Sequence, residues 1–490
     1  MADFSDRVAT LSPKKRALVE EALRRRREEG RGQGISKRHE SGPAPLSFSQ
    51  QRIWFLEQWE PGTPTNHGVR VFRLRGSLDV PALAAALEQI ARRHEILRTV
   101  YRMEGRDPRQ LVLDEWAVSL PVVDLSAIPE RERERELSRL LREQAREPFD
   151  LERDVMLRAT LFRLAADEHV FLLRLHHIAY DAYSDRVFFT ELSKLYSGTP
   201  LPELPIQYAD FAVWQRETLQ GPALTRLVDY WRETLEGAPA LLQLPTARPR
   251  RPVQRHEGTH RRFTLPGSFA NDTTELARRE GVTAYMALLA FFATLLYRVT
   301  GEKDVVVGSP IASRNQVELE HLVGFFSNTL VLRNRLGGNP SFREVLKRTR
   351  EVALGAYAHQ ELPFERIVEE LKIARDPSYN PIFQVNFRAH AAEASPLALP
   401  GIEAEALAVD IGFSRFDLAL ELRLSSDGID GYFEYDHDLF DLRTVEQLTD
   451  DLASLMEQAL ADPDSPILAL KVATRGRAGA RPTAIPRSHE

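Results

Sequence analysis

The sequence predicts an α/β fold, because segments typical of strands alternate with segments of helical period. Residues 69–74 and 170–176 are short, dense apolar runs of strand length. Residues 78–93 place three large apolar side chains on one helical face, and residues 187–196 form a second such helix, with Ser184 or Asp185 as its candidate N-cap. This alternation begins near residue 46 and predicts a layered α/β domain.

The same alternation returns after a proline-rich break at residues 200–205, so we expect a second α/β unit. We divide the chain into an N-terminal helix (11–29) and linker at 1–45, a first lobe at 46–219, a second lobe at 220–470 and a disordered tail at 471–490. In the second lobe we expect helices at 283–299, 342–357, 364–371 and 442–460, and strands at 304–311, 383–387 and 418–424.

The composition excludes several classes of protein. The 490 residues are 43% hydrophobic and 28% charged, which is ordinary for a globular protein and rules out wholesale disorder. There is no cysteine, so disulfides, cysteine-ligated metals and a thiol nucleophile are excluded. A net charge of −6 gives no global basic field that would recruit nucleic acid. The apolar run at 284–297 is shorter than a bilayer span and the N-terminus lacks a secretory signal, so we expect a cytoplasmic protein without a membrane segment.

Two adjacent histidines end the apolar strand at 170–176 and carry the clearest chemical signal. His176 and His177 are followed by Asp181 and then by the expected helix. Because consecutive strand residues point to opposite faces, one imidazole could face a cleft while the other packs. A neutral imidazole there could act as a general base near pH 7 or position an amine. A metal site is the weaker interpretation, because no third ligand is clustered nearby.

Seven ordered segments between residues 46 and 381 make the signal far more specific than the histidine pair alone. They are LSFSQQRIWFL (46–56), RHEILRT (93–99), HHIAYDAYS (176–184), YADFAVW (208–214), VGFFSNT (323–329), HQELPFE (359–365) and RDPSYNP (375–381). Together they resemble the condensation domains of nonribosomal peptide synthetases, and the third is similar to that family's HHxxxDG motif.

This resemblance implies two lobes similar to chloramphenicol acetyltransferase, arranged as a V with a tunnel between them. An upstream donor and a downstream acceptor carrier protein would present thioesters on phosphopantetheine arms, with an adenylation domain as a further neighbour. The acceptor amine would attack the donor thioester and form an amide. No cofactor bound by the domain itself and no metal are implied, and a monomer suffices for such a two-lobed chain.

The resemblance also implies roles for the motif residues. His177 would orient or deprotonate the amine, or stabilise the tetrahedral species. His176 would be mainly structural. Asp181 would form a structural salt bridge with an arginine of the second lobe, for which Arg314 is the best match.

Other residues of the matching segments are candidates for substrate binding or for packing. Trp54 and Phe55 are expected in the core, and Pro363 is expected at the first position of a helix. The candidates for contact with substrate are Arg52, Arg98, Ala182, Tyr183, Ser184, Ser327 and Asn328. For the two arginines, pairing with carboxylates of the protein is an equal alternative.

Ala182 departs from the family pattern, which has glycine at this position. At a positive φ an alanine would be strained by roughly 1–2 kcal/mol, whereas at a negative φ its methyl group would only narrow the tunnel beside His177. Two alternatives to the peptide-forming function stay open, the first as a known variation on this fold and the second because of Ala182. One is a free-standing enzyme that forms an ester or amide with a soluble nucleophile and so releases a chain. The other is a catalytically impaired platform that binds carrier proteins.

Overall fold

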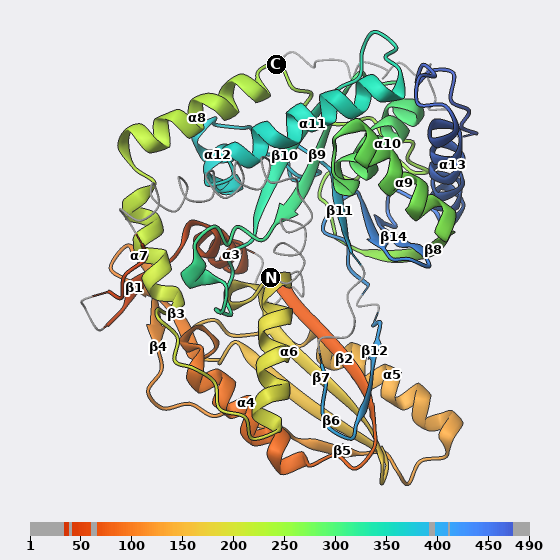
Figure 1. The fold of residues 1–490 in the computed structure, drawn as a ribbon. Helices are drawn as coiled ribbons and strands as arrows, with labels where there is room; N and C mark the ends of the chain where they lie inside the picture. Colours follow the sequence, from red (N-terminus) through yellow and green to blue (C-terminus); the bar gives the residue numbers. More distant parts are fainter. Residues whose placement is uncertain (1–33, 39–41, 60–65, 392–396, 410–411, 474–490) are drawn as a thin grey trace, which may run out of the picture.

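The computed structural model describes residues 34–38, 42–59, 66–391, 397–409 and 412–473. The helix expected at 11–29, most of the linker and most of the tail expected at 471–490 lie outside the described residues. Each half of the described chain is built around its own β-sheet, with the five-stranded sheet in the lower part of Figure 1 and the six-stranded sheet in the upper part. The mixed helix-and-strand class predicted from the sequence is therefore confirmed.

The five-stranded sheet has the strand order β12-β2-β7-β6-β5. Its long central strands are antiparallel, and only β5 pairs with β6 in parallel. β7 is buried along almost its whole length, as expected for a central strand covered on both faces. The strands are β2 (His67–Arg75), β5 (Val122–Asp124), β6 (Leu157–Ala165), β7 (Glu168–His176) and β12 (Glu403–Leu407).

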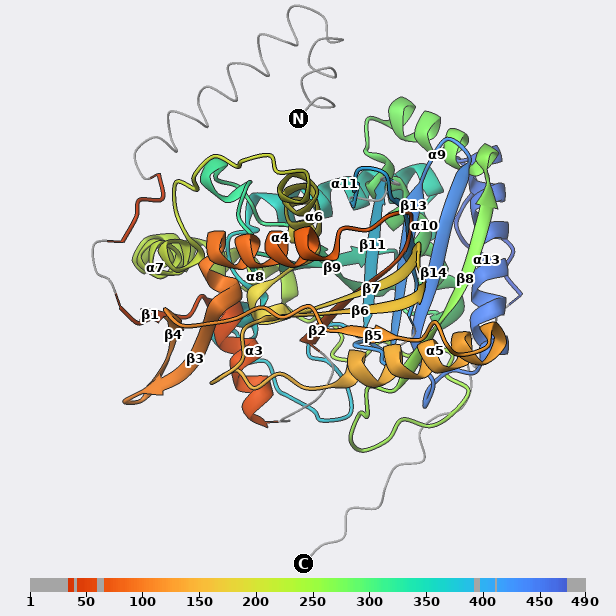
Figure 2. The ribbon, with the colours of Figure 1, turned by 90° about the horizontal axis from the view of Figure 1, so that it is seen from below.

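Helices cover both faces of this sheet. α4 (Val80–Arg93) and α6 (Ala182–Tyr196) lie on one side, and α5 (Glu130–Arg146) lies on the other (Figure 2). α4 begins at Asp79, whose carboxylate accepts a hydrogen bond from the amide of Ala82 at 2.9 Å. Its apolar stripe then packs into the larger of the two cores of this half.

A small sheet of β1 (Ala44–Pro45), β4 (Asp107–Val112) and β3 (Thr99–Glu104) lies beside the five-stranded sheet. Two helices adjoin it: α3 (Phe48–Trp59), which contacts the turn after β7, and α7 (Tyr208–Thr218), which contacts β1. α7 leads into α8 (Gly221–Leu235), whose apolar side chains join the core of the other half. The chain therefore passes from one half to the other between α7 and α8.

The six-stranded sheet has the order β10-β9-β11-β13-β14-β8. α9 (Gly267–Glu280), α10 (Ala284–Thr300), α11 (Phe342–Ala358) and α13 (Leu442–Ala461) pack on it, and α12 (Phe364–Glu370) contacts β10 and α3 (Figure 1). Its strands are β8 (Gly258–Pro266), β9 (Asp304–Ile311), β10 (Asn328–Arg335), β11 (Val385–Ala391), β13 (Leu418–Leu424) and β14 (Gly428–Asp436).

One face of the six-stranded sheet is apolar and the other carries charges. On β13, Leu418, Leu420 and Leu422 enter the core beneath the helices. The intervening Glu421 lies on the opposite face, directly across from Arg388 of β11 and Tyr432 of β14. This charged face of the sheet matters for the site described below.

Two segments of the second half join the first. β12 pairs with β2 in antiparallel register from Glu403 opposite Arg75 to Leu407 opposite Val71, and the two strands lie side by side in Figure 1. Apolar side chains within residues 319–326 and 397–399 also belong to the core of the N-terminal half. Segments that follow residue 220 in the chain thus contribute to the core and the sheet of the first half.

Most of the expected elements are confirmed to within a few residues, and some need correction. α6 begins at Ala182 rather than at residue 187, with Asp181 as its N-cap instead of Ser184 or Asp185. Pro363 occupies the N-cap of α12 rather than its first helical position. Phe55 was expected in the core and is 47% exposed, lying against Trp59 with ring centroids 6.3 Å apart. Trp54 is half-buried against the core.

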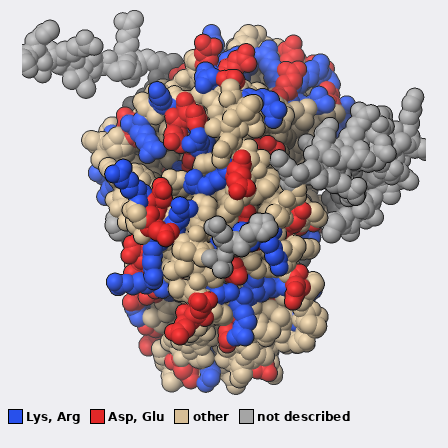
Figure 3. Space-filling view, turned by 90° about the vertical axis from the view of Figure 1, so that its left-hand side faces the viewer, with Lys and Arg blue, Asp and Glu red and all other residues tan. Residues whose placement is uncertain are grey.

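The surface shows no segregation of charge on the face drawn in Figure 3, where basic and acidic side chains are interspersed. This distribution agrees with the modest net charge of the chain.

Among the described residues no single helix is long and apolar enough to cross a membrane. Within these residues, only α9 and α10 taken together are long and apolar enough, and these two helices are bent by 104° relative to each other.

Candidate active site

The two histidines lie where β7 ends and the chain turns into α6. His176 is the last residue of β7, and His177–Ala179 form a single 3-10 turn. Asp181 then caps α6 by accepting a hydrogen bond from the amide of Ser184 at 2.9 Å. An apolar strand, a tight turn and a capped helix thus place His177 at the end of a central strand.

The hydrogen bonds of His177 determine which of its nitrogens is available for chemistry. Nδ1 lies 3.1 Å from the carbonyl oxygen of Tyr180. A carbonyl only accepts, so Nδ1 carries the proton and donates it. In the neutral ring Nε2 then keeps its lone pair and can accept a proton or a hydrogen bond. The ring of Phe325 lies nearby, with centroids 6.3 Å apart.

The surroundings of His177 keep its imidazole neutral. Burial lowers its pKa well below the usual range, and the positive charges of Arg415 and Arg70 lower it further. The ring is partly rather than fully buried, unlike its neighbour His176, which is 1% exposed. His177 is therefore an unprotonated base at neutral pH, held in one tautomer and still accessible.

Asp181 joins the two halves of the chain through one buried carboxylate. Its Oδ2 accepts from Arg314 at 2.9 Å and from the amides of Phe326 and Ser327 at 3.0 and 3.1 Å. The expected ion pair with Arg314 is thus present in the structure, with side-chain exposures of 1% and 3%. Three bonds from residues 314–327 to one oxygen fix the loop that carries Phe325 beside His177.

Tyr183 and Ser184, two candidates for substrate contact, are engaged in the same junction. The Ser184 hydroxyl accepts from the amide of Gly324 at 3.1 Å and contacts the carbonyl of that residue at 3.0 Å. The guanidinium of Arg314 lies over the ring of Tyr183 at 4.4 Å. Both side chains therefore hold the halves together through contacts within the protein.

Asn328 and Ser327 lie at the start of β10. The side-chain amide of Asn328 donates to the carbonyls of Gln360 and Leu362, both at 2.9 Å, and its oxygen accepts from the amide of Phe364 at 2.9 Å. These bonds use the polar atoms of Asn328 to hold the segment before α12. Ser327 is half-buried, and its amide binds Asp181.

Arg52 and Arg98 pair with groups of the protein. Arg52 donates to Glu365 at 2.8 Å and so ties α3 to α12. Arg98 donates to the carbonyl of Leu113 at 2.7 Å and lies 3.8 Å from Glu95. Of the two interpretations left open by the sequence, these contacts favour pairing within the protein.

Ala182 is the first residue of α6 and is exposed. Among the described residues, the non-glycine positions with positive φ are His256, Ser313, Asn339, Lys372 and Ile382. Ala182 therefore carries no left-handed strain, and the alanine in place of the family's glycine fits the backbone without distortion.

Charged groups from both halves act on His177 and were not predicted from the sequence. Arg415 precedes β13, and Arg70 of β2 donates through Nε to both oxygens of Asp185 at 2.9 Å. Arg388, whose side chain is 37% exposed, lies 3.2 Å from Glu421 on the charged face of the six-stranded sheet. The sequence signal for such a charged face was the alternation of charged residues with leucines in β13. The fold is needed to show which way the charged face of the six-stranded sheet points.

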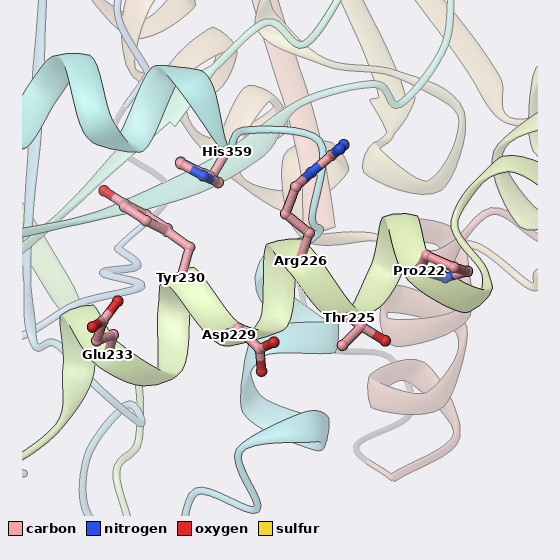
Figure 4. A pocket seen from close by; sticks show the side chains of 7 residues that line it. All are labelled: Pro222, Thr225, Arg226, Asp229, Tyr230, Glu233 and His359. Carbon is pink, nitrogen blue, oxygen red and sulfur yellow. The ribbon is translucent and has the colours of Figure 1, made fainter.

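No group of three potential metal ligands gathers within the part of the chain that the structure describes. A surface hollow lies along α8, where Tyr230 and His359 stack with ring centroids 3.6 Å apart (Figure 4). None of the residues lining it comes from the junction around His177. The histidine pair, rather than this hollow, is therefore the candidate active site.

Comparison with known proteins decides the family. A family model described as "Condensation domain" matches residues 40–478. The chain belongs to the condensation-domain family. Condensation domains are acyltransferases that form peptide bonds in nonribosomal peptide synthesis, and their fold is similar to chloramphenicol acetyltransferase. The predicted family and its mixed helix-and-strand fold are confirmed, and the V with its central tunnel stays a prediction.

Similar proteins come from antibiotic biosynthesis. The chain is 43% identical over 447 residues to a linear gramicidin synthase of Brevibacillus parabrevis, covering 89% of this chain and 9% of that protein. It is 41% identical over 485 residues to phosphinothricin tripeptide synthetase PhsC of Streptomyces viridochromogenes, covering 97% and 44%. The chain thus spans less than half the length of either relative.

A solved structure shows the same fold. The crystal structure of the X-domain from teicoplanin biosynthesis superposes with a TM-score of 0.82 at 30% identity, over 90% of this chain and all of that chain. Because the likeness extends over 90% of this chain, it covers parts of both halves of the molecule.

Proposed function

We propose that this condensation domain joins two carrier-bound substrates by an amide bond. The amine of an aminoacyl group on the acceptor carrier attacks the thioester carbonyl of an acyl or aminoacyl group on the donor carrier. The observation that carries the proposal is the state of His177. It is neutral, it is accessible, and its Nε2 lone pair is fixed by the bond from Nδ1 to the carbonyl of Tyr180.

In the proposed reaction the amine nitrogen forms a bond to the carbonyl carbon, and the carbonyl π electrons move to oxygen. Nε2 of His177 accepts a hydrogen bond from the amine, and this bond aims the lone pair of the amine at the carbonyl carbon. Nε2 then takes the amine proton as the tetrahedral species forms. Collapse of that species breaks the carbon–sulfur bond. The thiolate of the donor arm leaves and takes the proton, so that His177 returns to its neutral form.

Positive charge around His177 suits this reaction. Burial lowers the pKa of Arg415 to about 10, which still leaves the guanidinium charged at neutral pH. Together with Arg70 it favours negative charge on the thioester oxygen, and it keeps the resting His177 unprotonated and able to accept from the amine. His176 and Asp181 take structural roles in this account, because both are buried and bonded to protein groups.

The partners follow from the same proposal. Donor and acceptor carrier proteins present their phosphopantetheine arms from opposite sides of the junction between the two lobes, which form the V and the tunnel expected from the sequence. The lobes correspond to residues 46–219 and 220–470 except for the crossing segments. The domain works as a monomer in the cytoplasm, beside carrier and adenylation domains, and its own fold supplies the catalytic groups.

A non-catalytic platform is the second candidate, because one similar structure is a complex of the teicoplanin X-domain with OxyB. Two observations weigh against it here. His177 retains a defined tautomer, and Ala182 fits its helix without strain. Release onto a soluble nucleophile uses the same His177 chemistry and differs only in the acceptor.

An intact-mass assay tests the proposal. One carrier is loaded with an aminoacyl donor and a second with an amino acid, and the mass of the condensed product on the acceptor carrier is followed. We expect product with the wild-type protein and none above background with His177→Ala. Product only with free amines or alcohols would replace the proposal by chain release. Carrier binding without turnover across a broad substrate panel would replace it by the platform.

A further inference from the structure

His176 is buried among protein side chains and lies away from any substrate. It is 1% exposed, and its ring packs edge-on against the rings of His67 and Phe149, with centroids 6.0 and 5.6 Å apart. A side chain in this position cannot touch the reacting groups. Its effect on the reaction must therefore pass through the neighbouring backbone.

The hydrogen bonds of His176 require one tautomer. Its Nδ1 lies 3.2 Å from the amide nitrogen of Ile178, which can only donate. Nδ1 is thus the acceptor, and in a neutral ring the proton sits on Nε2. Nε2 in turn lies 3.3 Å from Oε1 of Glu57, which can accept that proton in a hydrogen bond.

Glu57 is itself fixed in place. It is 8% exposed on α3, and the same Oε1 accepts from the side-chain amide of Asn66 at 2.7 Å. The buried residues of α3 include Gln50, Ile53 and Glu57, which have the spacing of one helical face. From that face Gln50 donates to the carbonyl of Ile178 at 3.2 Å. α3 therefore holds Ile178 on both sides, through Gln50 at its carbonyl and through Glu57 and His176 at its amide.

Ile178 directly follows His177 in the 3-10 turn, and the side chain of His176 caps that turn. The bond from His177 Nδ1 to Tyr180 spans the same turn. A change in the peptide between His177 and Ile178 therefore rotates the imidazole that faces the substrate.

We propose that Glu57 is a positioning residue for catalysis, which holds His176 in its Nε2–H tautomer and through it fixes the turn that aims His177. The inference rests on the proposed role of His177. Without the Glu57 carboxylate, the Nε2–H of His176 loses its acceptor. The ring can then move its proton to Nδ1, and in that form it can no longer accept from the amide of Ile178.

The kinetic test compares Glu57→Ala with Glu57→Gln, whose Oε1 can still accept from His176 and Asn66. We expect Glu57→Ala to lower kcat for amide formation at least tenfold, with KM for each carrier within about twofold of wild type. Glu57→Gln should stay within about threefold in kcat. The exposed neighbour on the same helix gives the matched control, Gln58→Ala, which should match wild type. Unchanged kcat in Glu57→Ala, or an equal loss in Glu57→Gln, would overturn the inference.

A spectroscopic test works without turnover. Protein labelled with 15N at its 13 histidines reports the tautomer of each ring, and loss of one signal set in His176→Gln assigns His176. We expect the Nε2–H form in wild type and Glu57→Gln, and a shift toward Nδ1–H in Glu57→Ala. An Nδ1–H form in the wild-type protein would refute the inference whether or not the proposed reaction is observed. An inactive wild type with the expected tautomer would refute only the proposed function.

Discussion

Asp181 and Arg314 form a buried ion pair, 2.9 Å between Oδ2 and Nη1, that joins the loop after the histidine pair to the second half of the chain. The same carboxylate oxygen binds two backbone amides of residues 326 and 327. One aspartate thus sets the distance between His177 on one side of the junction and Phe325 on the other.

Arg314→Ala leaves the carboxylate of Asp181 buried without its cation. We expect the free energy of unfolding to fall by about 3–5 kcal/mol, because an unpaired buried charge keeps its desolvation cost. Urea denaturation measures the loss. Adding Asp181→Asn to Arg314→Ala should recover part of it. A double variant less stable than Arg314→Ala would contradict the account.

Ala182→Gly restores the residue typical of the family. Because Ala182 has no positive φ, we expect the rate of amide formation to stay within about twofold of wild type. The free energy of unfolding should fall by no more than about 1 kcal/mol, the helix-propensity difference between the two residues. A tenfold gain in rate would mean that the alanine methyl group obstructs the substrate.

Asn328→Ala tests whether this residue is structural. Its side chain satisfies two carbonyls and one amide before α12, so we expect a loss of about 1–3 kcal/mol in the free energy of unfolding. KM for both loaded carriers should change by less than twofold, measured by product mass at varied carrier concentration. A large rise in KM with unchanged stability would instead place Asn328 in contact with substrate.

The stability of the protein should depend on pH through its buried histidines. Burial lowers the pKa of His67 to about 4, against about 6.5 in the unfolded chain. Between these values the unfolded chain binds a proton that the folded protein does not, so stability falls as the pH falls through this window. For His67 alone this amounts to about 2 kcal/mol at pH 5.

His67→Gln isolates that contribution. The difference in free energy of unfolding between pH 7.5 and pH 5 should be smaller in the variant than in wild type by about 2 kcal/mol. The comparison also separates His67 from His390. The bond to Glu421 raises the pKa of His390, so His390 adds stability to the folded protein as the pH falls, whereas His67 removes it. An unchanged pH dependence in His67→Gln would show that His67 titrates normally in the folded protein.

The sequence predicted some of the strands and helices and missed others. β9 and β13 were predicted over the same residues that the structure shows, because β9 is rich in valine and β13 alternates leucine with other residues. β8 was missed because Arg261 and Arg262 interrupt its pattern at the sheet edge. The pairing of β12 with β2 joins residues more than 300 positions apart, which no local pattern can predict.

The ion pair beside the histidines was predictable from the sequence, but the geometry around it was not. The motif singled out His177, Asp181 and the partner Arg314, and the structure contains that ion pair. Ser184 and Asn328 have polar side chains that suit a substrate, and only their tertiary contacts show that the protein itself uses them. The effect of Arg415 on His177 arises across the two halves of the chain and could not be read from either segment.

The central claim is that the Nε2 lone pair of His177 promotes amide formation. The most direct measurement is the single-turnover rate at which condensed product appears on the acceptor carrier, with both loaded carriers saturating. We predict that His177→Ala lowers this rate at least a hundredfold while both carriers bind as tightly as they do to wild type. A His177→Ala rate within threefold of wild type would contradict the claim.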